Sequence, residues 1–302
     1  MTVPAQTLPP PEAPPPAAPP AAAPAQRRRA LRRILRNPLS AGGLVVVAVM
    51  LLAAALADVV APFPYELTNF DTTLQPPSPE HLFGTDELGR DQFSRVLHGL
   101  RVSVAVGVLS VVLSLLVGVP LGLLAGFYRV LDPVISRLTD TMLAFPFLVL
   151  AVGLAAILGP SQTTATIALG VGGVPLIIRV ARSETLRLRE LDFVAAAVAD
   201  GASDVAVLGR HILPNAVNAL IVQATVSVPA AVIGESVLSF LGLGVRPPTP
   251  SLGVMISSAQ PLFRDGPWLA VFPGVAIVLF TLALNLFGDG LRDALDPREV
   301  RR

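Results

Sequence analysis

This 302-residue chain alternates between polar segments and six apolar stretches. The apolar stretches lie at about residues 39–61, 102–127, 138–158, 163–178, 215–233 and 268–287. A helix rises about 1.5 Å per residue, so roughly 20 apolar residues cross the hydrocarbon core of a bilayer. The pattern therefore predicts an all-α, polytopic membrane protein with six transmembrane helices.

Two features within these stretches bear on helix packing. Pro146 lies in the middle of the third stretch, where a membrane helix tolerates it if neighbouring groups satisfy the freed carbonyl. Gly170, Gly172 and Gly173 lie in the fourth, and small residues let helix backbones approach closely. We therefore expect a continuous third span packed near a glycine-rich fourth span.

The basic residues predict how the spans are oriented. Seventeen of the 22 arginines fall in the amino-terminal tail, the connection at 128–137, the segment 179–214 and the carboxyl end. Cytoplasmic loops carry an excess of basic residues. Both termini and the segment 179–214 are therefore expected in the cytoplasm.

The amino terminus precedes the first span with a tail of unusual composition. Residues 1–26 are mostly proline and alanine, which cannot bury a core and favour disorder. Six arginines between Arg27 and Arg36 follow. A cleavable secretory signal is an alternative, because Ala53, Ala55 and Ala57 resemble a cleavage site, but such a signal usually precedes a soluble domain.

Composition excludes several classes of function. Hydrophobic residues make up 53% of the chain, charged residues 14%, and cysteine is absent, which rules out disulfides and thiolate metal sites. No P-loop or dinucleotide fingerprint occurs, so energy from a nucleotide must come from another chain. The three histidines, His81, His98 and His211, are far apart. We expect no cofactor, no metal site, no catalytic residue and no nucleic-acid partner.

The segment from Arg179 to Pro214 is a charged, helix-patterned island between apolar stretches. Asp192 is placed to cap a short helix, and Gly201 is a natural left-handed stop for it. Ser203 is placed to cap a second short helix that runs to Pro214. The simplest alternative is a solvated loop with helical propensity and no partner.

The island also carries a motif. Its letters AAAVADG and HILPN resemble the cytoplasmic loop of binding-protein-dependent ABC importer permeases. In that family the loop forms coupling helices that insert into a cleft of the ATPase subunit. The resemblance implies an ATPase-coupling loop at 190–214 that contains Asp192, Ala196, Ala197, Gly201, Ala202, Ser203, Asp204, Leu213 and Pro214.

One position departs from that motif. Ala195 stands where the family usually has glutamate. Three residues after Asp192, a glutamate would complete a capping box, so its absence is expected to cost up to about 1 kcal/mol of helix stability.

Three further stretches narrow the resemblance. Residues 83–103, 235–253 and 272–298 resemble the dipeptide, oligopeptide and nickel permease family, in particular its C-type subunit. That family implies the type I ABC importer permease fold in the bacterial inner membrane. It also implies a second homologous permease, two cytoplasmic ABC ATPase subunits and an extracytoplasmic substrate-binding protein. Peptides are the first expected cargo, and nickel or another small solute is the alternative.

The expected organisation follows from these segments. It comprises a disordered tail (1–26), a basic cytoplasmic segment (27–38), the first transmembrane helix (39–61), an outer segment (62–99), a core permease domain (100–290) with the coupling loop (179–214), and a cytoplasmic tail (291–302).

Two other classes of membrane protein fit less well. A secondary transporter needs ionisable residues buried in mid-span, and a membrane-embedded enzyme needs a convergent set of reactive groups. The spans contain almost no ionisable residues in mid-span and no convergent set of reactive groups.

A few polar residues near the span ends remain to be placed. Glu235 follows the fifth span, either as a functional intramembrane carboxylate or as an interfacial residue that hydrogen-bonds locally. Asn285 and Asp289 are expected to close the sixth span, with a turn at Gly288 and Gly290. Three charged residues of the outer segment predict an ion-pair cluster or a docking surface for a binding protein; they are Asp86, Arg90 and Asp91.

Overall fold

The computed structural model of the chain describes residues 37–295, and within them the regular secondary structure is helical apart from one isolated bridge between Thr85 and Asp91. The expected proline-rich tail, nearly all of the basic segment and the last seven residues lie outside this range. The helices are α2 (Pro38–Ala55), α3 (Ala57–Val60), η1 (Phe70–Thr72), α4 (Gln92–Phe127), α5 (Asp132–Ala144), α6 (Phe147–Leu158), α7 (Gln162–Leu188), α8 (Asp192–Ala199), α9 (Asp204–Ala206), η2 (Val207–Ile212), α10 (Leu213–Phe240), α11 (Leu252–Ala259), η3 (Gln260–Leu262) and α12 (Trp268–Leu295).

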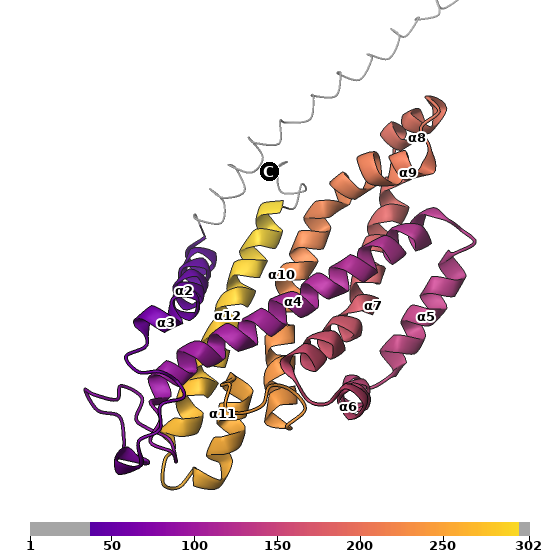
Figure 1. Cartoon of the computed structure of the whole chain (residues 1–302). Coiled ribbons are helices and arrows are strands. Elements are labelled where there is room, and N and C mark those ends of the chain that lie inside the picture. The colour runs from indigo at the N-terminus through magenta and orange to yellow at the C-terminus, as the bar shows by residue number, and fades with distance from the viewer. Residues whose placement is uncertain (1–36, 296–302) are drawn as a thin grey trace, which may run out of the picture.

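Long apolar helices form the body of the molecule (Figure 1). Five helices in the described part are long and apolar enough to cross a membrane, and a bent pair, α5 with α6, makes up to six spans. The short helices α8 and α9 lie at one end of this bundle, with the last turns of α12. The helix α11 and the segment before α4 lie at the other end (Figure 1). We call these the α8 end and the α11 end.

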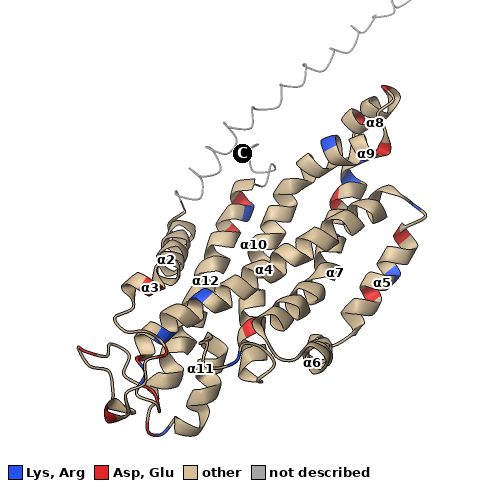
Figure 2. Ribbon diagram, in the orientation of Figure 1, with Lys and Arg blue, Asp and Glu red and all other residues tan. Residues whose placement is uncertain are grey.

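Charged residues gather toward these two ends, and most of the ribbon between them is uncharged, with α5 as the clearest exception (Figure 2). A charge at the centre of a spanning helix costs roughly 3 kcal/mol, so this separation is what a membrane-spanning bundle requires.

The closest packing in the bundle joins α4 to α7 through small residues. Gly118, Gly122 and Gly126 repeat every four residues on α4 and so lie on one face of it. A β-carbon at Gly122 would lie 2.5 Å from the β-carbon of Ala181, and one at Gly126 would lie 2.5 Å from that of Thr185. Only glycine allows the two backbones to approach this closely.

The expected glycine packing of the fourth span is also present. A β-carbon at Gly170 would lie 2.5 Å from Leu113 of α4, and one at Gly172 would lie 3.0 Å from Phe147 of α6. The hydroxyl of Ser114 donates to the Gly170 carbonyl at 2.7 Å, which adds a hydrogen bond across α4 and α7.

The expectation of a continuous third span is wrong. The chain breaks between α5 and α6, whose axes differ by 87°. Proline disfavours the helical conformation for the residue before it, and Phe145 is extended, with ψ of 126°. Pro146 then precedes α6, so this proline ends one helix and starts another.

Several other predicted boundaries shift because helices continue further than the apolar stretches do. The second short helix of the island does not end at Pro214, because α9, the π-helical turn η2 and α10 form one helix, Asp204–Phe240. The predicted turn at Gly288 and Gly290 is also wrong. The helix α12 runs through both glycines, and Gly290 packs against Ser40 of α2.

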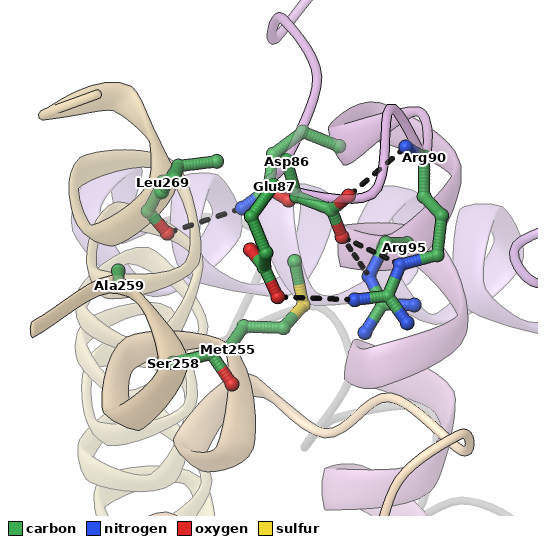
Figure 3. Close-up of a pocket in the computed structure, with 9 residues that line it drawn as sticks. Asp86, Glu87, Arg90, Arg95, Met255, Ser258, Ala259 and Leu269 are labelled. Atoms are coloured by element: carbon green, nitrogen blue, oxygen red, sulfur yellow. Dashed lines mark hydrogen bonds and ion pairs between the residues drawn. The ribbon is translucent and has the colours of Figure 1, made fainter. Parts of the chain in front are cut away.

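The segment before α4 is held by buried ion pairs, which Figure 3 shows in close-up. Arg90 donates to Asp86 at 2.7 Å, and the Nε atom of Arg95 lies 3.5 Å from the same carboxylate. Asp91 accepts a hydrogen bond from the Ser94 amide at 2.8 Å, so it caps α4, and it also pairs with His81 at 2.9 Å. The predicted ion-pair cluster is confirmed, and its use for docking stays a prediction.

The junction of α3 with α4 is expected to weaken in acid. His98 and then Arg101 bond to Asp58 and hold the pKa of its carboxyl below the usual value. A carboxyl with a lowered folded-state pKa stabilises the fold above its unfolded pKa, and this contribution is lost as pH falls through the folded pKa. Asp58→Asn is therefore expected to lower the thermal midpoint of the purified protein at neutral pH and to change it progressively less as the pH is lowered through the folded-state pKa of Asp58. Asp71→Asn, in the exposed turn η1, is the control and is expected to show no such pH-dependent difference.

Candidate functional site

The candidate site is the lobe formed by α8, the turn after it, α9 and η2, residues 191–212. It projects beyond the long helices at the α8 end (Figure 1). Half of the residues of α8 are alanine, the strongest helix former, which favours a short helix there. Its N-cap is Leu191, in an extended conformation, and Asp192 is the first helical residue, with no capping hydrogen bond. The expectation that Asp192 caps the helix is therefore wrong.

This register also changes the predicted effect of having alanine rather than glutamate at position 195. With the N-cap at Leu191, the third helical position is Val194, and a capping box needs its acidic residue there. A glutamate at position 195 would stand one residue too late. The expected loss of helix stability at Ala195 does not apply to this register.

The turn after α8 is stabilised as the sequence predicts. Gly201 has a φ of +81°, a left-handed conformation that L side chains rarely adopt. The amide of Ala202 donates to the Ala197 carbonyl at 3.0 Å, and the Gly201 amide donates to Val198 at 3.0 Å. These two bonds are the Schellman pattern at a helix end. Ser203 then caps α9 by accepting from the Ala206 amide at 3.4 Å, as expected.

One face of the lobe is buried against the bundle. Val194 of α8 packs in a cluster with Val207 and Ile212 of η2, and Leu188 at the end of α7 belongs to it. Ala197 of α8 is also buried. Val207 and Ile212 are fully buried. The position of α8 therefore depends on the long helix that continues into α10.

The opposite face of the lobe is apolar and exposed. Val198 is 54% exposed and Val205 is 79% exposed, and Phe193 is also in contact with solvent. Ala196 lies on the exposed surface as well. An exposed patch of apolar residues on a projecting element is typical of an interaction surface.

One polar contact ties the lobe to the connection before α5, and two more join α7, which leads into the lobe, to α4 and α5. The hydroxyl of Tyr128, between α4 and α5, donates to the Asp204 carboxylate at 3.0 Å, which raises the pKa of Tyr128 above its usual value. Arg189 donates to the carbonyl of Gly126 at 2.8 Å. Arg182 of α7 donates to Asp132, the first residue of α5, at 2.8 Å. A displacement of the lobe therefore acts on α4, α5, α7 and α10 together.

The structure brings most of the sequence-predicted site residues together. Seven of them lie in the lobe: Asp192, Ala196, Ala197, Gly201, Ala202, Ser203 and Asp204. Leu213 and Pro214 lie outside it, in the first turn of α10. Sequence reasoning missed the exposed apolar residues Phe193, Val198 and Val205, which their helical spacing could have indicated. Nothing local could have indicated Tyr128.

Two hollows lie deeper in the bundle. One, of about 240 Å³, is lined mainly by small and apolar residues of α4, α7 and α10, with Phe147 of α6. The other, of about 280 Å³, lies between α5 and α7 and is lined by polar and charged residues. Among the described residues, no group of three or more His, Cys, Asp or Glu side chains could hold a metal ion.

Glu235 was expected to follow the fifth span. It lies instead inside α10 and is wholly buried. Its Oε1 atom accepts from Ser239 at 2.7 Å, one turn later, so the expected local hydrogen bond is present. Its Oε2 atom has no hydrogen-bond partner among the described residues.

Sequence comparison decides the family of this chain. The profile of the family described as binding-protein-dependent transport system inner membrane component matches residues 118–301. The chain belongs to this family. A second profile, the N-terminal transmembrane domain of oligopeptide transport permease C, matches residues 25–77. The chain is thus a multi-pass inner-membrane permease of the ABC importer class, a family of permeases rather than of enzymes.

Several relatives match along most of their length. The dipeptide transport system permease protein DppC of Alkalihalophilus pseudofirmus is 43% identical over 90% of this chain and 90% of its own. The di/tripeptide permease DppC of Pseudomonas aeruginosa is 44% identical over 85% of this chain and 87% of its own. The glutathione permease GsiD of Pectobacterium atrosepticum is 39% identical over 90% of this chain and 91% of its own.

A solved structure confirms the fold. An inward-facing form of the MetNI methionine ABC transporter superposes with a TM-score of 0.56 and 20% identity, over 67% of this chain and 96% of that chain. The type I ABC permease fold expected from the sequence is therefore the fold of this chain.

Proposed function

We propose that this chain is the C-type permease subunit of an ATP-driven importer of di- or oligopeptides. It forms the transport path with a second permease, binds two ATPase subunits through the lobe, and receives substrate from an extracytoplasmic binding protein. The observation that carries this proposal is the exposed apolar face of the lobe around Val198 and Val205. Such a face has no role in a permease that works alone.

In this proposal the α8 end faces the cytoplasm, because the segment 179–214, with five arginines, lies at that end. The cytoplasmic position of both termini is part of the same proposal. ATP binding closes the ATPase pair and moves the lobe, and the bonds from Tyr128, Arg182 and Arg189 carry this movement to α4 and α5. The chain carries out no chemistry itself.

Peptide cargo is supported by the relatives, whose names specify dipeptides, di- or tripeptides, and glutathione. All of these are short peptides. Nickel or another small solute, carried by the wider family, is the alternative. Uptake of a labelled dipeptide into proteoliposomes, with competition by nickel salts, separates the two.

Val198→Asp is expected to abolish co-purification of the ATPases. A carboxylate on the exposed face of α8 would be buried without a partner in the interface, which costs several kcal/mol. The second permease should still co-purify, because its contacts lie elsewhere. The measurement is the subunit composition of the complex after extraction from native membranes in mild detergent.

Phe70→Asp is the matched control, because it places the same charge on a residue that is 71% exposed in η1, in the segment before α4. It should leave the ATPases bound. If Val198→Asp keeps them, the lobe is not the docking surface. If the wild type purifies without ATPases and transports peptide without ATP, the importer proposal fails and a secondary carrier must be considered.

A further inference from the structure

An exposed ion pair joins α5 and α7 well inside the bundle, as measured from the ends of these helices that lie toward the α8 end. Asp140 and Arg179 approach to 2.9 Å, and their side chains are 69% and 56% exposed. Asp140 is the ninth residue of α5, and Arg179 lies nine residues before the end of α7. At about 1.5 Å per residue, each lies roughly 12 to 14 Å inside its helix.

Charges at that depth do not face lipid without a large cost. Ionisable residues within spanning segments almost always face a water-filled cavity or another protein surface. The hollow of about 280 Å³ between α5 and α7 supplies such a cavity. Asp140, Arg179 and Arg182 line it, together with the hydroxyl-bearing residues Ser136 and Thr139.

The helix α5 has two unlike faces at this hollow. Ser136, Thr139 and Asp140 fall on the side that lines it. Val134 and Leu138 lie on the other side and are exposed and apolar. Because residues two positions apart in a helix point in nearly opposite directions, Ser136 and Leu138 report separately on the two faces.

A second hollow continues along the same helix α7. Leu176 and Ile177 border the hollow of about 240 Å³, and the next two residues, Ile178 and Arg179, border the charged one. The serines Ser110, Ser114 and Ser227 add hydroxyls to its otherwise apolar wall. The two hollows therefore lie in succession along α7, a mostly apolar one nearer its start and a charged one nearer the α8 end.

We propose that the Asp140–Arg179 pair lines the mouth of the transport path at the α8 end and exchanges its ion pair for the two terminal charges of a zwitterionic peptide. This inference rests on the proposed peptide-import function. The carboxylate of Asp140 takes the peptide's ammonium group, and the guanidinium of Arg179 takes the peptide's carboxylate, in the geometry that arginine provides for carboxylates. Because the pair is solvated, opening it costs little.

The chain contains no cysteine, so an introduced cysteine is its only thiol and can be labelled selectively within this subunit. Single variants Ser136→Cys and Leu138→Cys are assembled into the complete transporter in inside-out vesicles and treated with a membrane-impermeant thiol reagent. Ser136→Cys should react roughly tenfold faster than Leu138→Cys, because the reactive thiolate forms in water and not in an apolar environment. The unsubstituted transporter measures background labelling of the partner subunits.

A free dipeptide, added at millimolar concentration, should then slow the labelling of Ser136→Cys severalfold, and a dipeptide with blocked termini should not. Adding Asp140→Asn and Arg179→Gln should remove the protection by the free dipeptide. Equal labelling of both cysteines, no labelling of Ser136→Cys, or protection that survives the two charge substitutions would each overturn the inference. ATP-dependent dipeptide uptake is measured in parallel, so that its absence refutes the importer proposal itself, whereas uptake with another labelling pattern refutes only the role of this pair.

Discussion

Gly122→Leu is expected to separate α4 from α7 and to prevent stable folding. A β-carbon alone would lie 2.5 Å from that of Ala181 and 2.7 Å from the carbonyl oxygen of Ile178. Neither backbone nor β-carbon moves without the helix that carries it. Overpacking a tight interface costs about 3 kcal/mol or more, and small residues are the main means by which spanning helices approach each other.

The measurement is the yield and thermal midpoint of the purified protein in detergent. Gly122→Ala should give an intermediate loss, since it adds only the β-carbon. Gly153→Leu, in α6, is the matched control because no atom lies within 4 Å of the added β-carbon. A Gly122→Leu protein as stable as this control would show that α4 and α7 do not approach as closely as described.

Glu235→Ala is expected to have the second largest effect, a loss of about 3 kcal/mol. It removes the acceptor of the Ser239 hydroxyl in a site that is wholly buried. The side chains of Ser103, Ser236 and Ser251 surround the same carboxyl group. Each buried hydroxyl left without a partner costs about 1 to 3 kcal/mol, and the lost volume adds a cavity term.

Glu235→Gln is the comparison that identifies the cause. Its amide has the same shape, keeps an acceptor for Ser239 and gains donors for neighbouring oxygens. We expect it to be as stable as the wild type, because it also removes the cost of burying a carboxylate. Thermal unfolding of the wild type, Glu235→Ala and Glu235→Gln shows whether the lost hydrogen-bond acceptor or the lost charge lowers the stability. If Gln destabilises as much as Ala, the negative charge itself stabilises the joint between α4, α10 and α11.

Local signals in the sequence predicted much of the fold and part of the site. Long apolar stretches favoured spanning helices, since a helix makes all its backbone hydrogen bonds within one segment of the chain. Gly201 required a left-handed turn, and Ser203 was placed to cap α9. These features depend on residues within a few positions of one another. They are confirmed by the φ of +81° at Gly201 and by the Ser203 hydrogen bond.

The boundaries and interfaces could not be read in the same way. The register of α8, in which Leu191 rather than Asp192 is the N-cap, places Val194 in the cluster that contains Val207 and Ile212 of η2. The break at Pro146 depends on whether neighbouring helices could supply a hydrogen-bond donor for the carbonyl that a proline leaves unpaired in a continuous helix. A proline is compatible with both outcomes, and the expectation of a continuous span at this position was therefore wrong.

The pattern of residues was enough to show that this protein spans a membrane and where the island turns. The packing of the helices was needed to show that Gly118, Gly122 and Gly126 form the α4–α7 interface, that Glu235 is buried, and that Tyr128 bonds to Asp204. The last contact joins residues 76 positions apart. Spans that are apolar on every side carry no periodic signal of which face packs inward, so these contacts follow from the pairing of distant helices and not from local pattern.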